Sequence, residues 1–89
     1  MKLEILCIKN KGMGCWSQPW FVQSKLENEA EGLARTISFN SEARVKYKKC
    51  ALYHLGTFDD VTGKYDLLKD YVLLLDCDDV IAQLPEEKK

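Results

Sequence analysis

The sequence predicts a small α+β domain: an antiparallel or mixed β-sheet with one main α-helix packed on one face. Three observations support this fold class. Polar and apolar residues alternate near the start, a helical periodicity follows, and two apolar runs then flank a turn at residues 59–63. A chain of 89 residues has room for one such pair of layers. We therefore expect a single domain over residues 1–84 and a solvated tail over residues 85–89.

The first strand is expected at residues 2–9, KLEILCIK, where Leu3, Ile5 and Cys7 share one face. Leu6 and Ile8 make the second face partly apolar as well, so we expect this strand to be central in the sheet. Residues 10–19 contain two glycines, a proline and no periodicity, which indicates a loop. A short extended segment follows over residues 20–22.

The main helix is expected over residues 25–38. Ser24 and Glu27 have the spacing of a capping box, in which each side chain accepts a hydrogen bond from the other residue's backbone N–H. Five apolar residues then recur at helical spacing and define one face: Leu26, Ala30, Leu33, Ala34 and Ile37. We expect Phe39 to pack just beyond the helix end. Residues 43–49 fit either one more helical turn or a loop leading into the next strand.

A β-hairpin is expected next. Residues 50–58 read as a strand with two alternating sets of side chains, Leu52 and His54 on one face and Tyr53, Leu55 and Thr57 on the other. The segment 59-DDVTG-63 has the aspartates and the glycine of a tight turn. The chain returns through residues 65–68, and residues 71–77 form a further strand. Asp78 is placed to cap a short C-terminal helix over residues 79–84, which Pro85 ends.

The cysteines indicate buried thiols. Cys7, Cys15, Cys50 and Cys77 form no C-x-x-C pair, whereas a structural zinc site uses closely spaced ligands. We therefore expect no metal and no other cofactor. Three of them lie within or beside apolar runs, where a thiol packs as a small hydrophobic group. Reduced core thiols are typical of a cytoplasmic protein, and we expect no targeting segment and no membrane span.

Nothing in the sequence indicates an enzyme. His54 is the single histidine and lies in the middle of a strand. The segment 12-GMG-14 lacks the further glycine and the strand–turn–helix setting of a phosphate-binding loop. The acids Asp76, Asp78 and Asp79 do not have the spacing of a calcium-binding loop. We expect no catalytic residues.

Charge is unevenly distributed along the chain. Residues 1–50 hold nine Lys or Arg and five acids, a balance of +4, whereas residues 51–89 hold four and nine, a balance of −5. Such polarity suits a basic face for an anionic polymer or head-to-tail pairing with a second copy, and ordinary surface scatter also explains it.

The best candidates for a binding site are cations interleaved with aromatic rings. Single-strand binders combine positive charges that follow the nucleic-acid backbone with rings on which bases stack. Trp20 and Phe21 also fit a core position at the entry to the helix. Our candidate nucleic-acid-binding residues are Lys9, Lys11, Trp16, Arg44, Lys46, Tyr47, Lys48 and Lys49.

One segment also resembles a known family. Leu52-Tyr53, Leu55-Gly56, Phe58-Asp59 and Thr62-Gly63 are similar to the signature of a small nonstructural protein of gokushoviruses, single-stranded DNA phages of the Microviridae. The N-terminal strand, the Pro-aromatic segment and a helix with a central Arg35 match its layout. Lys48, Lys49 and Cys50 depart from it, because the family often has a proline and acids there.

This resemblance implies a nonenzymatic accessory protein of viral genome replication in the host cytoplasm, and we expect it to bind DNA, with single strands favoured. A homodimer or small oligomer would add core to so short a chain. The alternative is an adaptor that engages a host or phage replication protein and has no affinity for nucleic acid. In that case exposed aromatic residues would form the contact.

Overall fold

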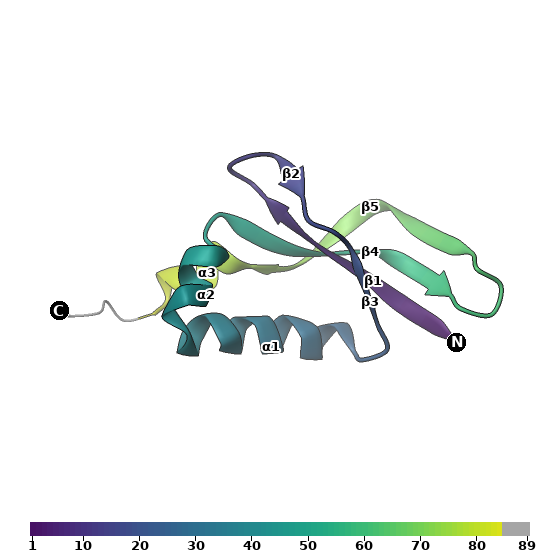
Figure 1. The fold of residues 1–89 in the computed structure, drawn as a ribbon, viewed down its shortest axis with the longest axis horizontal. Coiled ribbons are helices and arrows are strands. Elements are labelled where there is room, and N and C mark those ends of the chain that lie inside the picture. Colours follow the sequence, from purple (N-terminus) through teal and green to yellow (C-terminus); the bar gives the residue numbers. More distant parts are fainter. Residues whose placement is uncertain (85–89) are drawn as a thin grey trace.

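The computed structural model describes residues 1–84, so the tail predicted over residues 85–89 lies outside the described residues. The chain has an α+β fold, as predicted (Figure 1). Its elements are β1 (Lys2–Asn10), β2 (Cys15–Trp16), β3 (Trp20–Val22), α1 (Leu26–Phe39), α2 (Ser41–Lys46), β4 (Cys50–Asp59), β5 (Tyr65–Asp76) and α3 (Cys77–Ala82).

The strands form one antiparallel sheet in the order β2-β1-β4-β5, and β3 pairs with β1 along the same edge as β2. β1 is therefore central, as its two apolar faces predicted. It pairs with β4 from Lys2, opposite Asp59, to Asn10, opposite Cys50. The loop predicted at residues 10–19 was wrong in part, because the chain turns back and Trp16 pairs with Lys9.

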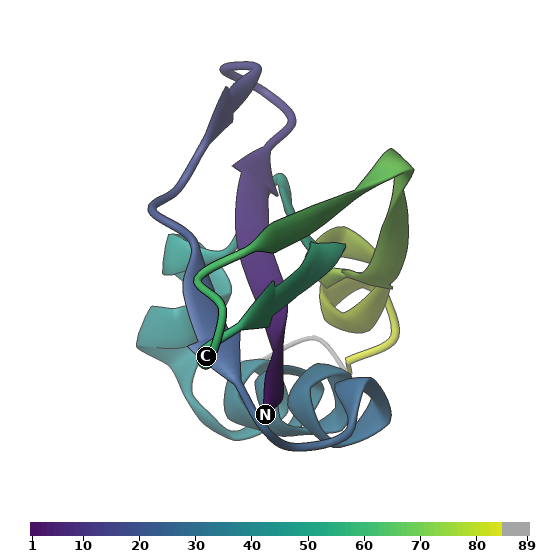
Figure 2. The ribbon, with the colours of Figure 1, turned by 90° about the vertical axis from the view of Figure 1, so that its right-hand side faces the viewer.

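The sheet has one face covered by helices and one open face. On the covered face, Ile8 of β1 packs against a buried cluster formed by Ile37 of α1, Cys50 and Cys77. Figure 2 shows the three described helices gathered on this side of the twisted sheet. Side chains alternate along a strand, so the set that begins with Leu3 and ends with Lys9 points to the other side. We call that side the open face, because no helix within residues 1–84 lies on it.

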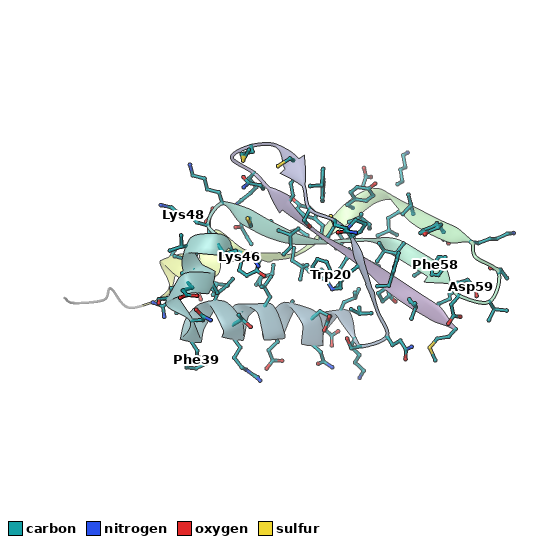
Figure 3. The ribbon with its side chains drawn as sticks, viewed as in Figure 1. Trp20, Phe39, Lys46, Lys48, Phe58 and Asp59 are labelled. Atoms are coloured by element: carbon teal, nitrogen blue, oxygen red, sulfur yellow. The ribbon has the colours of Figure 1, made fainter. Side chains whose placement is uncertain are left out.

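Helix α1 begins within one residue of its predicted start, but the predicted capping box is wrong. The residue that caps α1 is Lys25, and no side chain there accepts a hydrogen bond from the helix. The acids Glu27 and Glu29 lie in the first turn, where they interact favourably with the helix dipole. Phe39 is also not packed as predicted. It ends α1 with 85% of its surface exposed and points away from the sheet (Figure 3).

Residues 43–49, which the sequence left open, contain the end of a second helix. Asn40 caps α2, because its side-chain oxygen accepts hydrogen bonds from the N–H groups of Glu42 and Ala43 at 2.9 and 3.2 Å. The side chain of Arg44 turns back toward α1, where Nε donates to the carbonyl of Ile37 at 3.0 Å. A Lys49 φ of 63° then turns the chain into β4.

The turn between β4 and β5 has the predicted chemistry. Asp59 Oδ1 accepts a hydrogen bond from the N–H of Val61 at 2.9 Å, and this bond is the main reason that the pKa of Asp59 is lowered. Gly63 takes a φ of 74°. The two strands predicted beyond the turn are instead one strand, β5, whose residues 68–71 bulge opposite Leu55.

A β-bulge in β4 changes which side chains share a face. Gly56 lies opposite Ile5 and His54 lies opposite Leu6, so Leu55 is an extra residue in the ladder. The alternation is therefore reset within the strand. Directly opposite residues of an antiparallel pair point to the same face. The prediction that Tyr53, Leu55 and Thr57 share one face of the sheet is wrong for this reason.

Tyr53 lies opposite Cys7, and Phe58 lies opposite Leu3. Cys7 and Leu3 are four residues apart on β1 and share the open face, so Tyr53 and Phe58 share it too. Thr57 lies opposite Glu4 and belongs to the covered face. Without the bulge, Tyr53 and Phe58 would point to opposite sides, because their positions in the chain differ by five, an odd number.

The last helix begins earlier than predicted. Asp76, and not Asp78, caps α3, since its side chain accepts a hydrogen bond from the N–H of Asp78 at 3.0 Å. Asp78 instead accepts from the N–H of Lys49 at 2.8 Å. α3 ends at Ala82, and Pro85 lies outside the described residues.

The four cysteines are free thiols. Cys7, Cys50 and Cys77 are buried, as predicted, whereas Cys15 is exposed. Burial raises the pKa of the Cys77 thiol to about 11, so this group stays protonated at neutral pH. Within residues 1–84, no helix is both long enough and apolar enough to cross a membrane.

Candidate nucleic-acid interface

Trp16 lies at the centre of an aromatic cluster on the open face. Its ring meets that of Tyr53 edge to face, with ring centroids 5.2 Å apart, and that of Tyr71 in the same manner at 5.6 Å. Such contacts hold the indole in one orientation. Trp16 and Tyr71 each remain 41% exposed. We call Trp16, Tyr53 and Tyr71 the Trp16 group.

A positive charge accompanies this group. Lys9 lies opposite Trp16 in the sheet, and its Nζ is 5.4 Å from the centre of a Trp16 ring, within the range of a cation–π contact. The sequence placed Lys9 and Trp16 in the same candidate site. The strand pairing supplies what the sequence lacked, namely that both side chains are on one face.

A cleft extends the site away from the open face. It has a volume of about 450 Å³ and is lined by Ile8, Asn10, Cys15, Trp16, Ser17, Gln18, Trp20, Lys46, Tyr47 and Cys50. Lys46 Nζ lies 5.3 Å from the Tyr47 ring centre. Two more of the predicted residues thus lie together, and Trp16 borders both the cleft and the open face. Lys46 and Lys48 lie near the end of the molecule that carries α2 (Figure 3).

Trp20 belongs to the covered side of the sheet. It pairs with Leu6 of β1, which is fully buried, and lies between β3 and α1 in Figure 3. Trp20 is half-buried there and also lines the cleft, so it is not part of the fully buried core. Its neighbour Phe21 pairs with Ile5 instead and points to the open face, where it is 42% exposed.

Two of the predicted cations already have partners within the fold. Lys11 Nζ contacts Asp76 Oδ1 at 2.8 Å and Asp78 Oδ2 at 3.2 Å. The hydrogen bond to Asp76 is the main reason that the pKa of Lys11 is raised. Arg44 donates to the carbonyls of Ile37 and Ser38 at the end of α1. Both side chains hold elements together and contribute less than the other cations to a surface for an anion.

Lys48 and Lys49 are exposed, next to α2. The backbone N–H of Lys49 is bound by Asp78, and its side chain lies against Gly12. Lys9, Lys46, Lys48 and Lys49 therefore share one end of the molecule with Trp16 and Tyr47, although they do not share one face.

A second aromatic cluster was missed by the sequence analysis. Phe58 lies 5.4 Å from Phe21 and 4.7 Å from Tyr65, measured between ring centres. Tyr65 pairs with Phe58 across the hairpin and is 61% exposed. We call Phe21, Phe58 and Tyr65 the Phe58 group. A strict alternation assigns Phe58 to the face opposite Tyr53, and only the bulge at Leu55 brings it to the open face.

The groups considered for catalysis or metal binding make contacts with other side chains or backbone groups of the fold. His54 Nε2 lies 2.5 Å from Glu4 Oε2, and both side chains are largely enclosed. Asp76 and Asp78 both form ion pairs with Lys11, and Asp76 also caps the start of α3. Within residues 1–84, no three His, Cys, Asp or Glu side chains gather where they could hold a metal ion.

Comparisons of the chain with protein-family models, with curated proteins and with solved structures found no match. The open face and the cleft are therefore the observations from which a function can be inferred.

Proposed function

We propose that the protein binds single-stranded DNA without catalysing a reaction, and that the Trp16 group with Lys9 forms the centre of the binding surface. The proposal includes the setting that the family resemblance implies, an accessory role in phage genome replication in the host cytoplasm. Lys46, Tyr47, Lys48 and Lys49 extend the surface toward α2.

One observation carries this proposal. Trp16 is half exposed on a sheet face that no described helix covers, and Lys9 Nζ lies 5.4 Å from its ring. The face of the Trp16 ring that Lys9 does not cover gives a base a flat surface to stack on, and the Lys9 cation attracts the phosphate that follows. Stacking needs an unpaired base, so we propose single strands and not duplex as the ligand.

The net charge of −1 sets an expectation for affinity. A protein without a large positive field binds an anionic polymer through a local patch, and the salt dependence of that binding increases with the number of phosphates that the patch contacts. The patch proposed here contains few cations, so we expect a shallow salt dependence and a contribution from stacking that persists at higher salt.

The experiment is a titration of a fluorescently labelled octathymidylate with the full chain at low and moderate salt. Trp16→Ala should weaken binding about tenfold, since one stacked base contributes ~1–3 kcal/mol. Lys9→Gln should reduce the slope of log K against log salt by about 0.7, the value for one lost phosphate contact on a single strand. Quenching of tryptophan fluorescence gives a second readout.

Matched controls come from the opposite side of the molecule. Phe39→Ala removes an exposed aromatic ring at the end of α1, and Lys25→Gln removes an exposed cation at its start. Both variants should bind like the unchanged protein. If the folded protein binds no oligonucleotide at low salt, or if Phe39→Ala weakens binding as much as Trp16→Ala, the proposal is wrong.

A second candidate function is favoured by a different observation. Leu67 and Leu73 on β5 are 54% and 50% exposed on or beside the open face, and apolar area of this kind also suits a protein partner. The adaptor hypothesis predicts that a replication protein binds the open face while DNA does not. Capture of such a partner, abolished by Leu73→Ser and unaffected by salt, would favour it. A homodimer or small oligomer stays a prediction that sedimentation can test.

A further inference from the structure

The open face carries two ring clusters, and only one of them is used by the function proposed above. The Phe58 group is separated from the Trp16 group along β1, and Figure 3 shows Phe58 near the turn between β4 and β5, far from Lys46 and Lys48. A soluble domain rarely leaves two such clusters exposed on one face without a ligand for them. The arrangement of the two groups indicates what that ligand is.

Strand register gives their spacing. The Trp16 group is aligned with Lys9 and Cys7 of β1, which lie opposite Trp16 and Tyr53. The Phe58 group is aligned with Ile5 and Leu3, opposite Phe21 and Phe58. The centres of the groups are thus four residues apart along β1, which is roughly 14 Å at the usual rise of about 3.4 Å per residue.

This distance is too long for neighbouring bases. Stacked bases along one strand are about 3.4 Å apart, so roughly 14 Å corresponds to about four base steps, and to fewer if the backbone is extended. A dinucleotide can reach one group only. A longer strand that follows β1 can stack one base on each group.

The two groups also differ in charge. Lys9 is close to the Trp16 ring, at 5.4 Å. Tyr65, by contrast, borders a depression whose other lining residues include Lys2 and Lys64 but also Asp59 and Asp66. Cations and acids offset each other there. The Phe58 group therefore offers ring surface with little net charge.

From these observations we infer that the ligand is a single strand of about five or more nucleotides, held at two stacking positions with intervening bases unstacked. The inference rests on the proposed function and adds the class of ligand to it. The Trp16 group supplies stacking and phosphate attraction, and the Phe58 group supplies stacking alone. The bulge at Leu55 is what makes the second position available.

The test uses three octanucleotides of equal backbone length and charge. The first is octathymidylate, the second has three thymidines followed by five abasic units, and the third has three thymidines at each end and two abasic units between them. The third should bind the full chain about tenfold more tightly than the second. A protein with one stacking position would show only about a twofold preference, from the two equivalent ends.

The matched variants are Tyr65→Ala, which removes an exposed ring, and Tyr65→Phe, which keeps it. Tyr65→Ala should reduce the preference for the third oligonucleotide over the second from about tenfold to about twofold, with the salt slope unchanged. Tyr65→Phe should keep the full preference. Phe21→Ala should reduce the preference to the same extent as Tyr65→Ala. It replaces Tyr65→Ala in the experiment if circular dichroism shows that the Tyr65→Ala variant is unfolded.

Each outcome is distinguishable. If no oligonucleotide binds at low salt, the proposed function fails. If all three bind but the preference is twofold, or if Tyr65→Ala leaves a tenfold preference intact, the proposed function stands and the second stacking position does not exist. If the free protein sediments as a dimer that Tyr65→Ala dissociates, the Phe58 group belongs to a contact between copies, and the inference is overturned.

Discussion

At Gly56, a hydrogen atom occupies the position where every other residue would place its Cβ. A Cβ built there would lie 2.2 Å from the carbonyl oxygen of Asp66 and 2.8 Å from the Cα of Leu67, both on the neighbouring strand. The backbone φ of 154° is also one that other residues rarely adopt. These are backbone atoms of a paired strand, so they cannot turn aside as a side chain can.

Gly56→Ala should therefore lower the free energy of unfolding by about 1–3 kcal/mol or more, the usual cost of inserting a group into packed space. Denaturation in urea, followed by circular dichroism, measures this change. Gly32→Ala is the matched control, because a Cβ there meets nothing within 4 Å on an exposed helix position. It should raise stability by about 0.5–1 kcal/mol. Equal effects of the two substitutions would contradict this account.

At the scale of elements, one carboxylate joins the start of α3 to the turn before β4. Asp78 accepts a hydrogen bond from the N–H of Lys49 and contacts Lys11 Nζ. The bond from Lys49 is the largest reason that the pKa of Asp78 is lowered, and the contact with Lys11 adds to it. The folded state thus favours the ionised form of Asp78.

The direction of this pKa shift determines how stability should depend on pH. The stabilisation by Asp78 is complete above its ordinary pKa of 3.8 and is lost as the pH falls through the lower value of the folded state. Asp78→Asn should therefore lower stability at neutral pH, by about 1 kcal/mol since the side chain is partly exposed, and should flatten the loss of stability between about pH 5 and pH 2. Thermal unfolding across this range checks both effects.

Asp79→Asn provides the control, because Asp79 is the exposed neighbour of Asp78 on α3. It should leave both the neutral stability and the acid profile close to those of the unchanged protein. An acid profile of Asp78→Asn that coincides with that of the unchanged protein would show that the Lys49 and Lys11 contacts contribute nothing in solution.

The elements themselves were largely predictable, and their ends were not. The faces of α1 and β1 follow from local periodicity, which is why Ile37 and Leu6 were placed correctly. Caps depend on competing partners. Asp78 has the right position to cap a helix, but the N–H of Lys49, 29 residues earlier in the chain, binds its carboxylate. No local pattern reveals such a contact.

In the candidate site, too, features set by local sequence were predictable and features set by contacts between distant segments were not. The sequence placed Trp16 and Lys9 in one candidate site because cations and aromatic rings are interleaved along this part of the chain. The ion pair between Lys11 and Asp76 could not be predicted, because it joins segments that are far apart in the sequence. The hydrogen bond from Arg44 to the Ile37 carbonyl likewise depends on how α2 folds back onto the end of α1. The Phe58 group was missed because a β-bulge has no strong sequence signal apart from the glycine that follows Leu55.

At the scale of the whole molecule, stability depends on a small core beneath the helices and on Ile5, Cys7 and Ala51, which are buried on the open face. Ile37 is fully buried between β4 and α3, and partly buried side chains from β1 and α1 surround it. The open face adds ring contacts but leaves much of its apolar area in water. One core of this size implies that helices and sheet unfold together.

Ile37→Ala should accordingly lower the free energy of unfolding by about 2–5 kcal/mol, the range for deleting a large aliphatic side chain from a core. Circular dichroism, which reports the helices, and tryptophan fluorescence, which reports Trp16 and Trp20 beside the sheet, should give one coincident transition. Val61→Ala at the exposed hairpin turn should change stability by less than about 0.5 kcal/mol. Two separate transitions would contradict a single cooperative unit.

The extra residue at Leu55 has a consequence for variation in this chain. Removing that one codon would turn the outer half of the hairpin over, sending Phe58 toward the helices and Thr57 toward solvent, although no side chain other than Leu55 had been altered. Evolution of this surface is thus constrained by the number of residues between Tyr53 and Phe58 as well as by the glycine at position 56 among them.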